Sequence, residues 1–151
     1  MVIAVDFDGT CVSHEFPKIG KEIGAVPVLK YLVEHGHEII LYTMRSDKPH
    51  ATLLSDAIEW FNSHNIPLKG VNNNPTQHRW TDSPKIFANL YIDDANLGTP
   101  LHIAKGSARP YVNWCGVVSH LYMMNIIPLS DVTSLISQVQ DTKFNETMGE
   151  S

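Results

Sequence analysis

Residues 2–10 read Val-Ile-Ala-Val-Asp-Phe-Asp-Gly-Thr, an apolar run of four residues followed by two closely spaced aspartates. A short run without polar residues is typical of a strand that is buried on both faces of a parallel sheet. Ligands of such sheets bind beyond the carboxyl ends of the strands. The sequence therefore predicts that Asp6 and Asp8 lie at the ligand-binding end of the sheet.

Apolar runs and segments of helical periodicity alternate along the rest of the chain. Further strands are predicted over residues 38–43, 69–72, 88–92 and 101–104. Helices are predicted over residues 27–34, from about Pro49 until Asn65, over 114–127 and over 132–139. This alternation predicts an α/β fold, a Rossmann-like three-layer domain with a mostly parallel sheet of about five strands. We expect a single domain over residues 1–141 and a frayed tail over residues 142–151.

The composition argues against several classes of protein. Lys and Arg number 11 and Asp and Glu number 16 among 151 residues, which gives a net charge of −5. Because the cations are spread singly, neither a nucleic-acid polymer nor a membrane is an expected partner. No apolar run approaches the roughly 20 residues that span a bilayer. Two cysteines, Cys11 and Cys115, are too few for a disulfide framework, and the chain starts with a strand-like segment, so we expect a cytoplasmic protein.

Charged and hydroxyl side chains follow three of the predicted strands. Asp6 and Asp8 follow the first strand, Thr43 ends the second, and Asp93 and Asp94 follow the strand over 88–92. Carboxylates that converge on one rim repel one another. The cluster is therefore best explained by a hard divalent cation with oxygen ligands, for which Mg²⁺ is the common choice.

Positive charge and hydrogen-bond donors complete the predicted site. Lys85 supplies a cation, and the hydroxyl group of Thr43 is a donor. Gly9 has no β-carbon, so backbone amides can approach an anion closely there. Arg45 either grips a substrate or forms an ion pair on the surface. The combination predicts a phosphate site, with substrate-binding residues Gly9, Thr10, Thr43, Arg45 and Lys85.

Four separate motifs resemble those of the haloacid dehalogenase superfamily of phosphohydrolases. Asp6-Phe-Asp-Gly-Thr10 resembles its first motif, the Thr43 that ends Ile-Ile-Leu-Tyr-Thr the second, Lys85 the third and Tyr91-Ile-Asp-Asp94 the fourth. The motifs follow the family's order over residues 2–94, whereas residues 98–151 contribute little to the resemblance. Each motif is weak by itself, and the ordered combination is specific.

The resemblance implies a Mg²⁺-dependent phosphomonoesterase that acts on a small phosphorylated metabolite, such as a nucleotide or a sugar phosphate. It implies that Asp6 attacks phosphorus to form an aspartyl phosphate, and that Asp8 protonates the leaving oxygen and later deprotonates water. Thr43 and Lys85 would hold phosphoryl oxygens. The resemblance also implies the metal ligands: Asp6, the backbone carbonyl of Asp8, Asp93 and, directly or through water, Asp94.

The chain departs from larger members of that family in two short inserts. Only residues 10–26 and 73–84 stand where the family usually carries a cap domain. Neither insert is long enough to fold alone, so we expect no folded cap domain. The polar loop of residues 72–83, with His78-Arg79-Trp80, is expected to cover the site in part, and a neighbouring subunit of a homo-oligomer is the alternative lid.

Two other functions fit part of the pattern. A phosphate-binding or regulatory module without turnover would keep the scaffold. It is disfavoured by the presence of Asp6, Asp8, Thr43, Lys85 and Asp93. A receiver domain of a two-component system also places acidic residues, Thr and Lys around Mg²⁺. Its phosphoacceptor follows a later strand, whereas Asp6 follows the first.

Simpler interpretations apply to single residues: Asp94 caps a turn, and Cys11 is a small buried hydrophobe.

Overall fold

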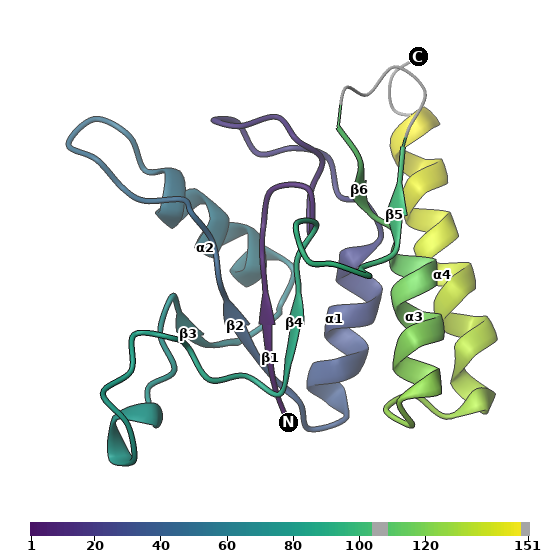
Figure 1. Cartoon of the computed structure of the whole chain (residues 1–151). Coiled ribbons are helices and arrows are strands. Elements are labelled where there is room, and N and C mark those ends of the chain that lie inside the picture. The colour runs from purple at the N-terminus through teal and green to yellow at the C-terminus, as the bar shows by residue number, and fades with distance from the viewer. Residues whose placement is uncertain (104–108, 149–151) are drawn as a thin grey trace.

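The computed structural model describes residues 1–103 and 109–148 (Figure 1). The main sheet consists of β1 (Val2–Val5), β2 (Glu38–Leu41), β3 (Leu68–Val71) and β4 (Leu90–Ile92). The strand order is β3-β2-β1-β4, and every neighbouring pair is parallel. The predicted α/β class with a mostly parallel sheet is confirmed.

The fifth predicted strand does not join this sheet. Residues Leu101–His102 form β5, which pairs antiparallel with β6 (Tyr111–Val112) in a separate two-stranded ribbon. Both residues of β5 are exposed, and their backbone pairs with β6 and not with β4. The last residue of the prediction, Ala104, lies outside the described residues. The ribbon is joined to the turn after β1, because the backbone N–H of Val112 donates to the carbonyl of Gly9 at 2.8 Å.

Two helices connect the first three strands. Helix α1 covers Ala25–Glu34 and α2 covers Leu53–Ser63. The prediction that α2 starts near Pro49 is wrong, because Lys48 and Ala51 close a tight turn with backbone hydrogen bonds of 2.9 and 3.1 Å. Asp47 then caps the helix, since its carboxylate accepts hydrogen bonds from the backbone N–H groups of Leu54 and Ser55 at 2.8 and 3.0 Å.

The carboxyl-terminal part of the chain forms a pair of packed helices, α3 (Trp114–Met123) and α4 (Leu129–Met148). Helix α3 stops before the predicted end at 127, because Asn125 has a left-handed backbone with φ of 58°. Helix α4 is longer than predicted and continues through most of the segment expected to be a frayed tail. Residues 149–151 lie outside the described residues.

The hydrophobic core lies where the helices meet the sheet. Alternate strand residues, Ile3 and Val5 of β1 with Ile39 and Leu41 of β2, are fully buried in it. Trp114 at the start of α3 is fully buried as well, and its indole N–H donates to the carbonyl of Thr10 at 2.7 Å. This bond ties α3 to the turn that follows β1. Among the helices of the described residues, none combines the length and apolar character needed to cross a bilayer.

Candidate functional site

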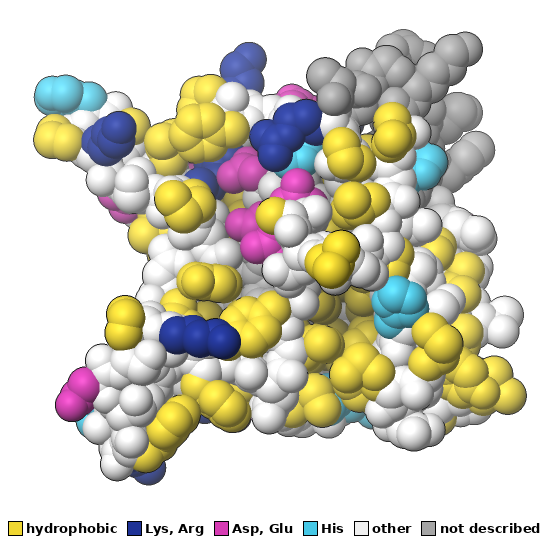
Figure 2. Space-filling model, in the orientation of Figure 1, with side chains coloured by type: hydrophobic (Ala, Val, Ile, Leu, Met, Phe, Trp, Pro, Cys, Tyr) yellow, Lys and Arg dark blue, Asp and Glu magenta, His cyan; other side chains and the backbone are white. Residues whose placement is uncertain are grey.

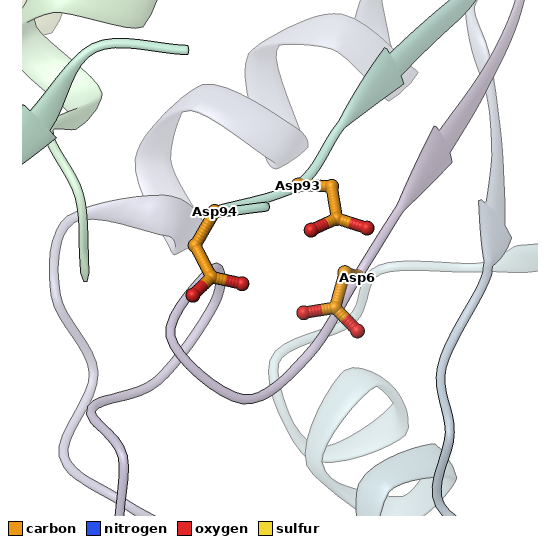
Figure 3. Close-up of side chains that lie close together, drawn as sticks. All are labelled: Asp6, Asp93 and Asp94. Atoms are coloured by element: carbon orange, nitrogen blue, oxygen red, sulfur yellow. The ribbon is translucent and has the colours of Figure 1, made fainter. Parts of the chain in front are cut away.

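Three carboxylates converge at one edge of the sheet (Figure 3). Asp6 follows β1 and Asp93 and Asp94 follow β4, and these two strands are parallel neighbours, so their carboxyl ends meet. The backbone N–H of Asp6 donates to the carbonyl of Ile92 at 3.0 Å and keeps the two chain segments together. One carboxylate oxygen from each aspartate lies within 4.8 Å of those of the other two. The predicted convergence of these three residues is confirmed.

The crowding of these carboxylates changes their acidity. Burial raises the pKa of Asp6 from 3.8 to about 7, and the negative charges of Asp93 and Asp94 add to the increase. Hydrogen bonds from the backbone of Phe7 and the hydroxyl of Thr10 oppose it. The pKa of Asp94 is also raised, chiefly by burial. The site therefore holds negative charge at a free-energy cost.

The donor set fits a hard divalent cation. The three clustered side chains offer oxygen atoms alone, and a cation between them would offset the repulsion that raises the pKa of Asp6. Mg²⁺, Ca²⁺ and Mn²⁺ all suit such ligands. The carboxylate of Asp8 does not belong to this cluster.

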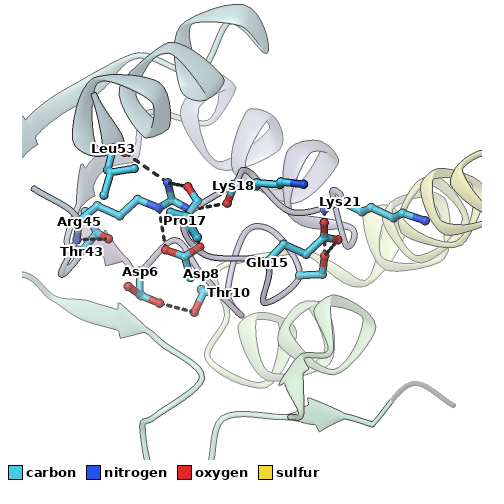
Figure 4. Close-up of polar contacts among 11 residues, drawn as sticks. Asp6, Asp8, Thr10, Glu15, Pro17, Lys18, Lys21, Thr43, Arg45 and Leu53 are labelled. Atoms are coloured by element: carbon cyan, nitrogen blue, oxygen red, sulfur yellow. Dashed lines mark hydrogen bonds and ion pairs between the residues drawn. The ribbon is translucent and has the colours of Figure 1, made fainter. Parts of the chain in front are cut away.

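Asp8 is held by Arg45 instead. Nε of Arg45 donates to Oδ2 of Asp8 and Nη2 donates to Oδ1, each at 2.7 Å (Figure 4). The two side chains thus form a bidentate ion pair in which the Arg45 side chain is 1% exposed and that of Asp8 20%. Both residues line the cavity that contains Asp6. The alternative that Arg45 pairs with a carboxylate is therefore the one observed, although the pair is buried and not on the surface.

Thr43 faces the same cavity and is nearly buried. Its backbone is fixed by Asn72, whose side-chain amide accepts from the N–H of Thr43 at 2.8 Å and donates to its carbonyl at 2.9 Å. The hydroxyl oxygen accepts the backbone N–H of Arg45 at 3.2 Å. The hydroxyl hydrogen is therefore available to a ligand in the cavity. Asn72 is a positioning residue that the sequence did not reveal.

Gly9 and Thr10 do not offer their amides to a ligand. The N–H of Gly9 donates to the carbonyl of Val12 at 2.7 Å, and that of Thr10 to the carbonyl of Phe7 at 3.2 Å. Their prediction as phosphate-binding residues is not supported, because the turn after β1 uses these donors itself. The hydroxyl of Thr10 instead donates to Oδ2 of Asp6 at 3.1 Å and accepts the N–H of Asp94 at 3.1 Å. Thr10 therefore braces the carboxylate cluster.

Gly9 is required for a different reason. Its φ is +82°, and a β-carbon there would lie 2.2 Å from the His14 ring. Nε2 of His14 lies 3.0 Å from the carbonyl of Pro110 and 3.3 Å from Oδ2 of Asp94. The absence of a side chain at Gly9 thus lets His14 reach Asp94.

Lys85 lies outside the cavity that contains Asp6. It is exposed and lines two other pockets, one with Tyr42 and the other with Trp80. The physical reason is that Lys85 precedes the start of β4, whereas Asp93 follows its end, and a three-residue strand rises about 10 Å. Spacing along the sequence did not bring its ammonium group to the carboxylates.

The loop of residues 72–83 also lies away from the carboxylates, and none of its residues lines their cavity. Gln77, in the short 3₁₀ turn η1 (Gln77–Arg79), binds the carbonyls of Ser83 and Lys85 at 2.8 Å and the N–H of Phe87 at 2.7 Å. These bonds fasten the loop to the segment that leads into β4 (Figure 1, teal). The expectation that this loop covers the site is wrong.

The cavity of about 690 Å³ has walls that sequence reasoning missed. They come from His14 and Phe16 in the insert after β1, from Met44 and Ala95, and from Arg109, whose Nη2 lies 3.9 Å from Oδ2 of Asp94. Figure 2 shows acidic side chains gathered here between basic and hydrophobic ones. The insert carries no periodic pattern. Only its position directly after Asp8 in the sequence could have indicated that His14 and Phe16 lie at the site. Arg109 lies just before β6 of the β5–β6 ribbon, and the first strand of this ribbon was predicted from the sequence but the second was not.

Comparisons with known proteins define the relationship of the chain. No protein-family model matches it, and no curated protein matches it. A solved structure described as a conserved protein from Bacteroides thetaiotaomicron is 34% identical in sequence, with a TM-score of 0.63. The match covers 87% of this chain and 96% of that one. With this identity over nearly the whole of that protein, the chain belongs to the same family as the conserved Bacteroides thetaiotaomicron protein.

Proposed function

We propose that the protein is a Mg²⁺-dependent phosphomonoesterase that uses the chemistry of the haloacid dehalogenase superfamily. One observation carries the proposal: Asp6, Asp93 and Asp94 converge within 4.8 Å in a cavity that also contains Asp8 and the hydroxyl of Thr43. A nucleophile, a second carboxylate for proton transfer and a cation site are the parts that this reaction needs.

The first step forms a bond between a carboxylate oxygen of Asp6 and phosphorus. The bond from phosphorus to the leaving oxygen breaks, and its electron pair stays with that oxygen, which takes a proton from Asp8. In the second step water gives a proton to Asp8 and attacks phosphorus, and the bond to Asp6 breaks. Inorganic phosphate leaves, the Asp6 carboxylate is restored, and Asp8 is protonated again.

The charges of the site set its requirement for metal. Asp6 attacks as a carboxylate, yet a pKa of about 7 leaves this group partly protonated at neutral pH. Asp6, Asp93 and Asp94 would hold the cation, which supplies positive charge against the carboxylates and the phosphate. The hydroxyl of Thr43 donates to a phosphoryl oxygen. The backbone carbonyl of Asp8 is proposed as a fourth ligand of the cation.

The cavity supports a small substrate. A volume of about 690 Å³ suits a nucleotide or a sugar phosphate, and a neighbouring subunit over its mouth stays part of the proposal. Cys11 and Cys115 are free thiols, which favours action in a reducing compartment such as the cytoplasm.

One observation favours a second candidate function, a phosphate-binding or regulatory module without turnover. Lys85 lies outside the cavity, so the cation that the family resemblance assigns to the phosphate does not face it. In such a module the three carboxylates would bind a cation, and a phosphorylated ligand would remain intact.

Release of inorganic phosphate separates the two candidates. Nucleotides and sugar phosphates are offered to the protein after exhaustive chelation and again with Mg²⁺, and hydrolysis should appear only with the metal. Asp93→Asn should lose at least about a hundredfold in kcat/KM, whereas Asp82→Asn, exposed and outside the cavity, should match the wild type. Full activity after chelation would contradict the metal dependence, and absence of turnover with every ester would favour the binding module.

A further inference from the structure

The guanidinium group of Arg45 donates hydrogen bonds to several parts of the chain (Figure 4). A guanidinium group has five N–H donors, and five hydrogen bonds leave this one. Two go to Asp8 at 2.7 Å each, and the others reach the carbonyls of Pro17 at 3.2 Å, Lys18 at 2.8 Å and Leu53 at 3.4 Å. Arg45 is only 3% exposed. No donor is left for a substrate phosphate, so its earlier assignment as a substrate contact is wrong.

Two aromatic rings enclose the guanidinium group. Its central carbon lies 5.1 Å from the ring centre of Phe7 and 5.4 Å from that of Phe16. Phe7 is fully buried in the core, whereas Phe16 is 61% exposed and forms a wall of the cavity. Arg45 therefore connects a residue of the core to a wall of the site.

The bonds of Arg45 join three parts of the chain that are distant in sequence. Asp8 belongs to the turn after β1, Pro17 and Lys18 to the insert that follows it, and Leu53 is the first residue of α2. A buried guanidinium is costly unless it is fully paired, and apolar side chains would fill the same space without that cost. A planar fork that bonds both oxygens of Asp8 fixes the orientation of the carboxylate, which a lysine cannot do.

We propose that Arg45 is a positioning residue that holds Asp8 and residues 16–18 as one unit against the start of α2. The orientation of the Asp8 carboxyl group and the place of the Phe16 wall then depend on the same side chain. The part of this proposal that concerns proton transfer rests on the proposed phosphatase function. The mechanical part, the coupling of Asp8 to residues 16–18, does not.

The catalytic part is tested with two esters. Arg45→Gln and Arg45→Lys are assayed on p-nitrophenyl phosphate, whose leaving group needs little acid help, and on an alkyl phosphate, whose leaving group needs a proton. Because general acid catalysis contributes about 10²–10⁴-fold, kcat should fall at least about tenfold more on the alkyl ester than on the aryl ester. Equal losses on both esters would overturn the positioning of Asp8.

The mechanical part is tested without activity, by trypsin cleavage after Lys18. The Lys18 side chain is exposed, but its carbonyl, which belongs to the scissile bond, is held by Arg45 at 2.8 Å. Arg45→Gln should speed this cleavage at least about tenfold, because cleavage requires local opening of the chain. Asp8 bonds to Arg45 through both carboxylate oxygens, so Asp8→Asn should also speed this cleavage if the unit is coupled. Cleavage after Arg79, exposed in the loop of residues 72–83, is the matched control and should not change.

Each outcome decides the proposal. Faster cleavage in both variants supports the unit, and unchanged cleavage in either variant overturns it. If the wild type hydrolyses neither ester, the phosphatase proposal fails while the cleavage rates still decide the coupling. If Arg45→Gln does not fold, the rate after Lys18 in Asp8→Asn carries the decision.

Discussion

The carboxyl group of Asp6 lies between opposing influences. Burial and the neighbouring charges of Asp93 and Asp94 favour its protonated form, whereas the hydroxyl of Thr10 and the backbone of Phe7 favour the charged one. The influences that favour the protonated form are stronger, and they raise the pKa of Asp6 to about 7. The proposed nucleophilic attack needs the charged form of Asp6, and the metal-free site disfavours that form.

The pH dependence of stability follows from this pKa. The folded protein binds a proton at Asp6 more tightly than the unfolded chain, whose carboxyl titrates near 3.8, so the metal-free wild type should lose stability between about pH 4 and pH 7. Asp6→Asn removes this loss. In the presence of a chelator, its free energy of unfolding should exceed that of the wild type at pH 8 by up to about 4 kcal/mol, and the difference should vanish below pH 4. Urea unfolding at the two pH values measures it, and a less stable variant at pH 8 would contradict the raised pKa.

At the scale of elements, the four strands of the main sheet and the helices between them were predictable, whereas the irregular segments were not. Apolar runs that end in Asp6 and Asp93 mark strand ends, and parallel pairing of β1 with β4 then brings both carboxylates to one edge. The prediction that Lys85 lies beside these carboxylates failed because Lys85 precedes β4, whereas Asp93 follows it. Arg45 bonds to residues in the insert after β1 and at the start of α2. These segments are distant from Arg45 in the sequence, so the residue pattern around Arg45 does not predict the contacts.

Gly9, in the turn after β1, can be compared with Gly36, which follows α1. A β-carbon at Gly9 would lie 2.2 Å from His14, whereas one at Gly36 would meet nothing within 4 Å, and φ is +82° and +79°. Alanine at either position bears the cost of a left-handed backbone, roughly 1–2 kcal/mol. Only Gly9→Ala must also displace His14 from Asp94. Urea unfolding should show Gly9→Ala to be less stable than Gly36→Ala by about 2 kcal/mol, and equal losses would contradict the close approach of His14.

At the scale of the whole molecule, the site is covered by its own nearest insert. His14 and Phe16 after β1, with Arg109 beside the β5–β6 ribbon, form its walls, and the polar loop of residues 72–83 packs beside the segment before β4. The sequence predicted that the loop of residues 72–83 covers the site. It did not point to the insert of residues 10–26, because both segments are short and polar. The pairing of Val12 with Asp8 and Glu22, which folds the first insert back over the site, is a long-range contact that periodicity does not predict.

Substrate affinity should therefore respond to the walls and not to the loop. Met44 lines the cavity and is 98% exposed, whereas Trp80 lines a different pocket. Met44→Ser should raise KM for p-nitrophenyl phosphate by at least about threefold, because an apolar contact with the leaving group is lost. Trp80→Ser should leave kcat and KM unchanged. Steady-state kinetics of the two variants measures this, and a larger effect from Trp80→Ser would contradict the placement of the loop.

The most direct measurement of the central claim is the trapping of a phosphoryl group on Asp6. Asp8→Asn keeps the proposed nucleophile but removes the group proposed to activate water, so p-nitrophenyl phosphate with Mg²⁺ should leave a persistent acyl phosphate. Peptide mass spectrometry should find the added phosphoryl group on Asp6, hydroxylamine should remove it, and Asp6→Asn should show none. A label on Asp8, or near-normal kcat in Asp6→Asn, would contradict the account.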